Sequence, residues 1–392
     1  MAASSEAVSE WDDARGHLIR QLTAGLRRYQ KNAYLMRVWS EASQTNQVVL
    51  AATIAQYFYA ELPPQHHFRV PFNFNALSSA DCVSKFRFGK AQIESLVSLF
   101  ALDAIRTRER TAANGVEGLC IVLYKLAIPL RWKDLESFFG RTESGLSNLF
   151  LHVLDHLESK FADLLYFNHE YAANHVQTYA DAVFDAGGSM QNVWAFVDGT
   201  VRGICRPKAR NSQRDGKYRS QKSVYNGHKR KHALRYQTLS TPDGLITHVY
   251  GPFPGRNHDI KLFKDSRIAN VIRGDARFKP YRIYGDQAYG NDSVLSSPFT
   301  GAVANLSREQ KLVNKSMSKV RVSVEWGYGQ VVNYWTALDL KRQARSGTQP
   351  VGSMYRVAIL LTNCLTCANG GNTISDYFRL PPPSLEEYLK GS

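Results

Sequence analysis

The stretch Val193-Trp-Ala-Phe-Val-Asp-Gly-Thr200 decides the fold class of this chain. Its five consecutive apolar residues, followed by an acid and a glycine, predict a strand that is buried on both faces. A carboxylate at the end of a buried strand is costly unless it is paired, hydrogen-bonded or holding a cation. The segment therefore predicts an α/β core with a chemically important acid, Asp198, at the edge of its sheet.

Further strands are expected downstream, and two of them are also followed by acids. Leu234–Leu239 and Leu245–Tyr250 lie on either side of a Pro-Asp-Gly turn, and Tyr281–Tyr284 forms another short apolar segment. Asp259 follows the second of these segments and Asp286 the third. Strand ends can converge at one edge of a sheet, so we expect the acids to lie close together.

Residues 311–335 allow two interpretations. A strand would explain the alternation of Val320, Val322 and Val324. A helix explains a longer pattern, formed by Val320, Val324, Tyr328, Val331 and Trp335. We take the helix because the longer match is less often accidental. Glu325 then lies on this helix, one turn after Arg321. Residues 357–368 predict a buried closing helix, and the tail after Gly370 is expected to be irregular.

The four acids Asp198, Asp259, Asp286 and Glu325 are candidate metal ligands as a group. Each acid alone is more often a turn residue or a surface charge. Clustered carboxylates without thiolates or several histidines favour Mg²⁺ or Mn²⁺ over zinc. Two such ions about 4 Å apart stabilise the attacking and leaving oxygens of an in-line displacement at phosphorus. The pattern therefore indicates phosphodiester chemistry.

The positive charge of the chain is concentrated directly after the first acid. The net charge is 49 − 34 = +15, and residues 201–235 alone contribute 12 − 1 = +11. Such a run is often only a solvated loop, but Tyr218, Tyr225 and Tyr236 among the cations favour nucleic acid, whose phosphates bind Lys and Arg. We expect DNA contacts from Arg202, Arg206, Lys208, Arg210, Lys229, Arg230 and Lys231, and also from Arg321.

The first 185 residues show helical periodicity, beginning with Leu18, Leu22 and Leu26. Residues 132–139, a turn at 140–142 and residues 143–157 fit a helix-turn-helix, with Thr142 as N-cap. An ordinary helical hairpin is the alternative. In the first case Arg141 and Ser144 would contact DNA. The expected domains are residues 1–80 (helical), 81–185 (helical, DNA-binding), 186–370 (catalytic) and 371–392 (tail).

Composition excludes several classes of protein. The chain has 392 residues with 44% hydrophobic and 21% charged side chains, which is typical of a globular protein. Five widely spaced cysteines do not form a secreted disulfide framework, and Cys364 and Cys367 fit a helix core better than a zinc site. The N-terminal segment lacks a signal-peptide pattern, and no apolar stretch is long and continuous enough to predict a membrane span. We expect a soluble intracellular protein with a polyanionic partner.

The four acids lie in four short motifs, separated by 259 − 198 = 61, 286 − 259 = 27 and 325 − 286 = 39 residues. The motifs are Phe196-Val-Asp-Gly-Thr200, Pro254-Gly-Arg-Asn-His-Asp259, Tyr284-Gly-Asp-Gln-Ala-Tyr289 and Val320-Arg-Val-Ser-Val-Glu325. In order and spacing they resemble the DDE endonuclease domain of PIF/Harbinger transposases, over about residues 190–370. This resemblance implies an RNase H-like domain, a mixed sheet flanked by helices, preceded by an all-α region with a helix-turn-helix-like unit.

The resemblance also implies roles for individual residues. By position, Asp198, Asp286 and Glu325 correspond to the catalytic triad that binds two divalent ions, Mg²⁺ or Mn²⁺, and Asp259 to an additional acid that faces the metals. The basic loop is longer than is usual in the family. Double-stranded DNA, a Myb-like accessory protein, a homo-oligomer on DNA, a nuclear location with the cytoplasm as a second site, and no membrane are the corresponding expectations.

The leading hypothesis is a DNA transposase that hydrolyses phosphodiesters and transfers strands at transposon ends. One alternative is a domesticated transposase-derived protein that binds DNA or regulates without cutting it. Another is an RNase H-like nuclease that acts on RNA or on a hybrid duplex.

Overall fold

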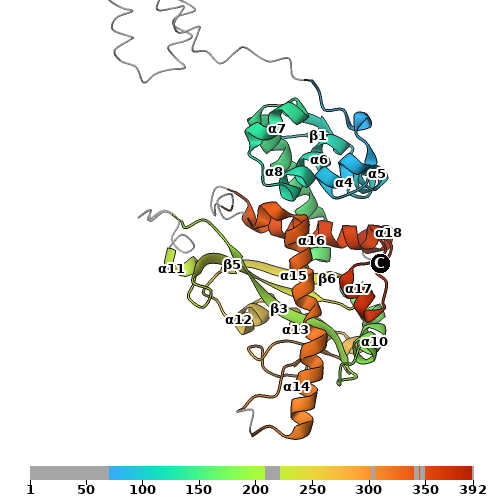
Figure 1. Cartoon of the computed structure of the whole chain (residues 1–392), viewed down its shortest axis with the longest axis vertical. Coiled ribbons are helices and arrows are strands. Elements are labelled where there is room, and N and C mark those ends of the chain that lie inside the picture. The colour runs from blue at the N-terminus through green and yellow to red at the C-terminus, as the bar shows by residue number, and fades with distance from the viewer. Residues whose placement is uncertain (1–69, 208–220, 302–304, 340–343, 345–348, 391–392) are drawn as a thin grey trace, which may run out of the picture. The chain divides into compact units, whose positions relative to one another are not determined.

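The computed structural model describes residues 70–207, 221–301, 305–339, 344 and 349–390 (Figure 1). The helices expected near Leu18 lie outside these residues. Val70–Ser392 form one compact unit, separate from Met1–Arg69. The domain divisions expected at residues 80, 185 and 370 stay predictions.

A six-stranded mixed sheet forms the centre of this unit. Its main strands lie side by side in the order β6–β5–β3–β7–β8, with the short β4 beside the start of β5. β3 pairs antiparallel with β5 and parallel with β7, while β5–β6 is antiparallel and β7–β8 parallel. The strands are β3 (Val193–Gly203), β4 (Tyr225–Asn226), β5 (Lys231–Ser240), β6 (Ile246–Pro254), β7 (Arg282–Tyr284) and β8 (Leu295–Ser296).

The four predicted strands are present, but β3 differs from the prediction. The apolar run was expected to end at Asp198, whereas β3 continues to Gly203. The reason is β5, which pairs with β3 from Phe196 to Gly203 and places Thr238 opposite Asp198. Asp198 thus lies inside a long strand, at a point where its other neighbour, β7, has already ended.

Helices cover both faces of the sheet (Figure 1). On one face Phe196 and Tyr284 pack against Val320 and Val324; on the other, Val197 belongs to a separate core. The helices after residue 160 are α9 (Ala162–Phe167), α10 (His169–Asp185), α11 (Gln221–Val224), α12 (Asp259–Ser266), α13 (Ile268–Gly274), α14 (Arg308–Arg321), α15 (Ser323–Tyr334), α16 (Val351–Ala368), α17 (Thr373–Phe378) and α18 (Leu385–Lys390). The helical interpretation of residues 311–335 is confirmed.

The described residues between 70 and 160 are mostly helical but not all-α. A two-stranded hairpin, β1 (Ala104–Arg106) with β2 (Ala112–Asn114), interrupts it. Its strands have only three residues each, too short for the period-two pattern that reveals a strand in sequence. The helices are α4 (Ser79–Phe86), α5 (Lys90–Leu99), α6 (Gly115–Ala127), α7 (Trp132–Phe139) and α8 (Glu143–Lys160).

The turn between α7 and α8 is built as predicted. Gly140 ends α7 with φ = 64°, and a Cβ there would lie 2.2 Å from the carbonyl oxygen of Val70, so only glycine fits. The Thr142 side chain accepts a hydrogen bond from the backbone N–H of Gly145 and caps α8. The N-cap predicted at Thr142 is therefore confirmed, and the helix-turn-helix interpretation stays a prediction.

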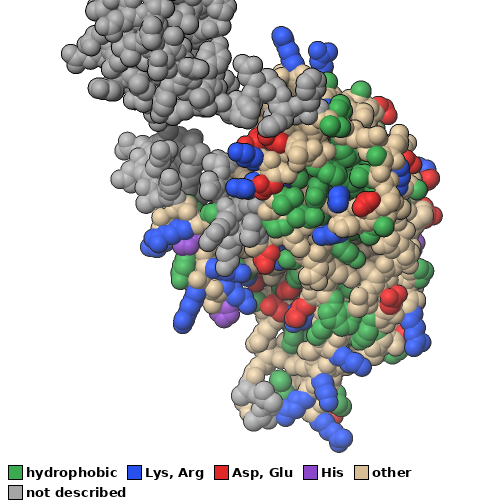
Figure 2. Space-filling model, turned by 45° about the horizontal axis from the view of Figure 1, so that its top comes forward, with side chains coloured by type: hydrophobic (Ala, Val, Ile, Leu, Met, Phe, Trp, Pro, Cys, Tyr) green, Lys and Arg blue, Asp and Glu red, His purple; other side chains and the backbone are tan. Residues whose placement is uncertain are grey.

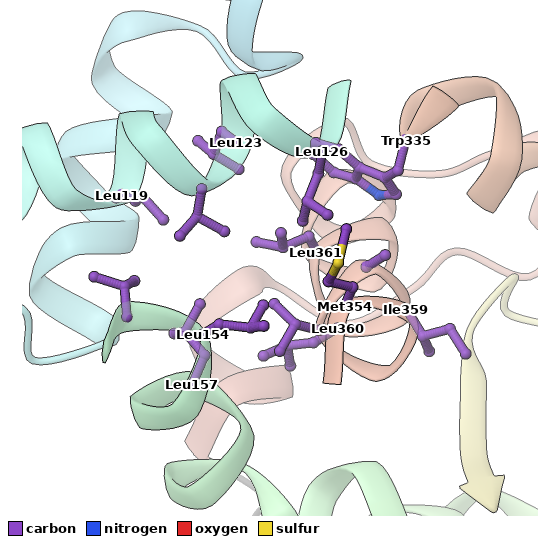
Figure 3. Packing of buried hydrophobic residues seen from close by; sticks show 14 of the residues in the cluster. Leu119, Leu123, Leu126, Leu154, Leu157, Trp335, Met354, Ile359, Leu360 and Leu361 are labelled. Atoms are coloured by element: carbon purple, nitrogen blue, oxygen red, sulfur yellow. The ribbon is translucent and has the colours of Figure 1, made fainter. Parts of the chain in front are cut away.

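A continuous apolar core joins this helical region to the sheet region. Figure 3 shows leucines of α6 and α8 packed against Trp335 and against Met354, Leu360 and Leu361 of α16. The two cysteines of α16 are buried and unpaired, in agreement with the prediction of a core role. By length and composition α16 is apolar enough to cross a membrane, and 72% of it is buried inside the protein.

The C-terminal tail is not irregular as expected, because α17 and α18 are packed and hydrogen-bonded. Asn372 caps α17 through the backbone N–H groups of Ile374 and Ser375. The buried Tyr388 of α18 accepts a hydrogen bond from Asn363 of α16 at 2.9 Å. Both helices are only six residues long, and tertiary contacts rather than intrinsic propensity decide such short elements.

Candidate active site

Asp198 and Asp286 lie at the same level, Asp198 within β3 and Asp286 two residues beyond the end of the parallel strand β7. Phe196 of β3 is in register with Tyr284 of β7, and each acid follows two residues later. Paired strands lie about 4.8 Å apart, so the register brings the two acids together. Because side chains alternate along a strand, Asp198 shares the face of Phe196, which is covered by α14 and α15.

The carboxylate of Asp198 carries a charge that the protein compensates only in part. Burial raises its pKa to about 6, and the negative charges of Asp286 and Asp259 raise it as well. The backbone N–H of Gly199 and the Arg321 guanidinium act in the opposite direction without restoring the ordinary value. Such a group is a natural ligand for an external cation, which would offset the cost of its burial.

Asp259, the first residue of α12, approaches β3 from the other face. Its Oδ1 lies only 2.1 Å from the position that a Cβ of Gly199 would occupy, whereas the Asp198 side chain leaves the strand on the opposite side. Asp259 Oδ2 accepts a hydrogen bond from Arg235 Nη2 at 2.9 Å, and both side chains are about 15% exposed or less. Burial is the main cause that raises the pKa of Asp259, and Arg235 opposes it.

Arg235 is held in place by a second contact and by its register. Its Nη1 donates to the backbone carbonyl of Asn257, and on β5 it stands opposite Val201, on the face of Gly199. The positive charge next to Asp259 is therefore part of the fold. The structure brings Asp259 close enough for its charge to raise the pKa of Asp198, and for the charge of Asp286 to raise the pKa of Asp259. The carboxylate oxygens of Asp259, however, point to Arg235 and Gly199.

Glu325 lies in the first turn of α15 and is exposed. The preceding residue, Val324, packs in the core beside Phe196, which places this turn over β3. One turn later the Tyr328 hydroxyl donates to the backbone oxygen of Asp198 at 2.9 Å and bonds to the Thr238 hydroxyl at 2.7 Å. These bonds fix α15 against β3 next to the two aspartates.

Within the described residues, no three His, Cys, Asp or Glu side chains gather into a group that could hold a metal ion. The structure thus brings Asp198 and Asp286 together and sets Glu325 on the helix that covers them. It does not place the Glu325 side chain against them.

The predicted DNA-binding cations have varied surroundings. Arg202 points inward: its guanidinium lies 5.2 Å from the Tyr355 ring centre and 6.0 Å from that of Tyr328, so its prediction as a DNA contact does not fit this position. Lys229 and Arg230 are exposed in the turn before β5, and Lys231 is the first residue of that strand. The Arg206 side chain donates a hydrogen bond to the Gln221 side chain. Lys208 and Arg210 lie outside the described residues.

The remaining two predicted contacts lie in the helical region. Arg141 forms an ion pair with the nearly buried Glu117 of α6. This pairing ties the guanidinium to the protein interior and differs from the free DNA contact that was expected. The Ser144 hydroxyl lies 3.1 Å from that of Thr142, in the first turn of α8.

Sequence reasoning missed two residues of this site, Arg235 and Tyr328. Arg235 was counted only as one cation of the basic segment, and its pairing with Asp259 depends on strand register, which sequence does not show. Tyr328 stood in the apolar stripe of the predicted helix. Its position three residues after Glu325 already placed both on one helical face, and this signal could have identified it.

With this geometry described, a comparison with known families is informative. Residues 197–363 match the family model of the DDE superfamily endonucleases. The matched segment begins next to Asp198, contains all four acids and ends within α16. It supports a transposase-like nuclease of the DDE type in this part of the chain. No curated protein and no solved structure matches the chain.

Proposed function

We propose that this protein is a DNA transposase of PIF/Harbinger type, or a host protein derived from one, that cuts phosphodiester bonds at transposon ends. The sheet supports this proposal. If β3, β5, β6, β7 and β8 are numbered 1 to 5 along the chain, their order in the sheet is 3-2-1-4-5. Strand 2 is antiparallel to its neighbours 1 and 3, and strands 1, 4 and 5 are parallel to one another. This is the arrangement expected of an RNase H-like nuclease.

The observation that carries the proposal is the partly compensated Asp198 beside Asp286. Two hard carboxylates on adjacent strands fit Mg²⁺ or Mn²⁺, and the raised pKa of Asp198 reflects a charge that needs a counterion. Rotation of the exposed Glu325 side chain toward them would complete the set. Divalent ions supply charge stabilisation for the attacking and leaving oxygens of the phosphodiester.

In this proposal each neighbouring residue has a task. Asp198, Asp286 and Glu325 would hold two cations, and Arg321, whose charge reaches Asp198, attracts a phosphate. Tyr328 fixes the Asp198 backbone. Water attacks the phosphodiester and displaces the 3′-oxygen, which leaves as a free 3′-hydroxyl; this hydroxyl then attacks a phosphodiester of target DNA and displaces a 3′-hydroxyl of the target strand. The α7–α8 unit reads the transposon end in the major groove, while Lys229 and Arg230 contact its backbone.

The same proposal covers the partners and the location. Double-stranded DNA is the substrate, a homo-oligomer assembles on it, a Myb-like protein assists end binding, and the protein acts in the nucleus. The PIF/Harbinger resemblance supports these points.

The test is a nicking assay with Mg²⁺ on a duplex that carries the inverted repeats flanking the coding gene. Asp198→Ala and Glu325→Ala should each lower the nicking rate by at least about a thousandfold, the scale at which loss of transition-state charge stabilisation is felt. Asp181→Ala and Glu386→Ala, exposed acids of α10 and α18, are the matched controls. Nicking that survives in either site variant would reject the assignment.

Tight DNA binding without nicking under any divalent ion would favour the domesticated, non-cutting alternative, and preferential cleavage of RNA or hybrid duplexes would favour the RNase H-like alternative.

A further inference from the structure

Helix α14 extends past the sheet at the end of the molecule opposite to the α4–α8 region (Figure 1). Only Met317 and Val320, near its C-terminal end, are buried. The helix passes almost without interruption into α15, because Val322 at the junction has helical dihedrals of −53° and −26°. The exposed part of α14 is therefore a continuation of the helix that carries Glu325.

One face of this helix carries a row of lysines. Lys311, Lys315 and Lys319 are exposed and recur every four residues, which spaces them about 6 Å apart on one face. We call these three residues the lysine row. Figure 2 shows blue side chains at this end of the molecule.

The charge of the lysine row is not neutralised within the described residues. None of the three lysines takes part in an ion pair there. Residues 308–321 contain five Lys or Arg and one acid, a net charge of 5 − 1 = +4. That acid, Glu309, is engaged by the Ser307 hydroxyl in the N-terminal cap. A partner for the row must come from outside this part of the chain.

The extended helix is braced, which keeps the row straight. The Asn314 side chain donates to the backbone oxygen of Phe299 at 3.0 Å and accepts from its backbone N–H at 2.9 Å. The Ser316 hydroxyl donates to Ser189 at 2.7 Å, next to the start of β3. A rigid, regularly spaced row of cations suits a rigid, regularly spaced polyanion.

We infer that the lysine row binds phosphates along the duplex DNA that leads away from the cleaved bond. This inference rests on the proposed function. Along the helix, Lys319 and Lys311 precede Glu325 by 6 and 14 residues, or about 9 and 21 Å. One DNA strand advances about 3.4 Å per nucleotide, so the row follows the duplex from about three to about six base pairs beyond the site.

The experiment measures binding of the full chain to a random-sequence 30-base-pair duplex at several salt concentrations. Each lost phosphate contact lowers the slope of log K against log salt by about 0.9. The triple variant Lys311→Gln, Lys315→Gln, Lys319→Gln should therefore reduce the slope by about 2 to 3. A matched triple variant, Lys264→Gln, Lys279→Gln, Lys390→Gln, removes the same charge from exposed lysines elsewhere and should leave the slope near that of the unmodified protein.

Proximity is tested by tethered cleavage. Fe-EDTA attached to Lys315→Cys should cut the bound duplex, whereas the same reagent on Lys279→Cys should not. An unchanged slope in the lysine-row variant, or an equal drop in the matched variant, overturns the inference, and so does an unmodified protein that does not bind duplex DNA. Self-association that is lost in the lysine-row variant while its salt slope is kept would identify a protein interface and also overturn it.

Nicking of transposon-end DNA separates this inference from the proposed function. Nicking together with an unchanged slope rejects the lysine row alone. A reduced slope with tethered cleavage, but without nicking, supports the row and rejects the nuclease.

Discussion

The two sides of strand β3 present the same chemical group with different partners. On the side of α15, the Asp198 carboxylate is buried, its pKa is raised to about 6, and no ion pair within the described residues neutralises its charge. On the side of α12, burial also raises the pKa of Asp259, but its carboxylate is paired with Arg235. The fold depends on the pair because loss of one partner leaves a buried charge, whereas an acid without a full counter-charge is free to bind a cation from solution.

The largest effect on stability is expected from Arg235→Leu. This change leaves the buried Asp259 carboxylate without its counter-charge, so the free energy of unfolding should fall by about 3 to 5 kcal/mol. Adding Asp259→Asn should restore most of the loss because it removes the unpaired charge. Denaturant unfolding at pH 7 measures both. Lys261→Leu, which breaks the exposed pair with Asp265 on the same helix, should change stability by less than about 1 kcal/mol. Equal effects of the two changes would remove the distinction between the two sides of β3.

A smaller loss is expected from Gly199→Ala, about 1 to 3 kcal/mol, because the new Cβ would overlap the Asp259 carboxylate. In an Asp259→Ala background the same change should have almost no effect, so the two substitutions should be strongly non-additive. Gly274→Ala is the control, since nothing lies within 4 Å of its Cβ position. Additive losses would show that Asp259 does not lie against Gly199.

On the other side of β3 a gain in the free energy of unfolding is expected, because Asp198→Asn should stabilise the protein. The folded-state pKa of about 6 lies above the ordinary 3.8, so the folded state binds more protons between these values and loses stability as pH rises through them. At pH 8 the variant should gain about 3 kcal/mol, since the shift spans about two pKa units and each unit corresponds to about 1.4 kcal/mol. Below pH 4 the gain should disappear. Unfolding curves at both pH values, with the exposed Asp181→Asn as control, provide the check. A variant less stable than the unmodified protein at pH 8 would mean that the protein already compensates this charge.

The smallest effect is expected from Tyr328→Phe, a loss of about 1 kcal/mol for the hydrogen bonds to Asp198 and Thr238. Tyr377→Phe is the matched control, because that buried hydroxyl has no partner among the described residues. If DNA nicking is observed, Tyr328→Phe should slow it more than Tyr377→Phe does, since only Tyr328 holds the Asp198 backbone. Equal effects of the two changes would assign Tyr328 to packing alone.

The sequence predicted the parts of this fold that depend on local pattern. The apolar run before Asp198, the helix that carries Glu325 and the Thr142 cap follow from periodicity and capping chemistry, and the structure contains all three. The acids after several predicted strands also led to the expectation that they converge at one edge of the sheet. The ion pair between Arg235 and Asp259 could not be predicted, because it depends on which residues of β5 face α12. The inward position of Arg202 was missed for a similar reason, since the rings of Tyr328 and Tyr355 that enclose it come from two later helices.

The shared core of α6, α8 and α16 limits how this protein can evolve. Leucines of the helical region pack against α16, the closing helix of the sheet region. Replacing either region with an unrelated domain would therefore expose apolar surface of the other. Under the proposed function, in which α8 reads a DNA sequence and β3 carries one acid of the cutting site, this core would fix the interval between the recognised bases and the cut. A change in that interval would require a rebuilt core, and lengthening a linker would not suffice.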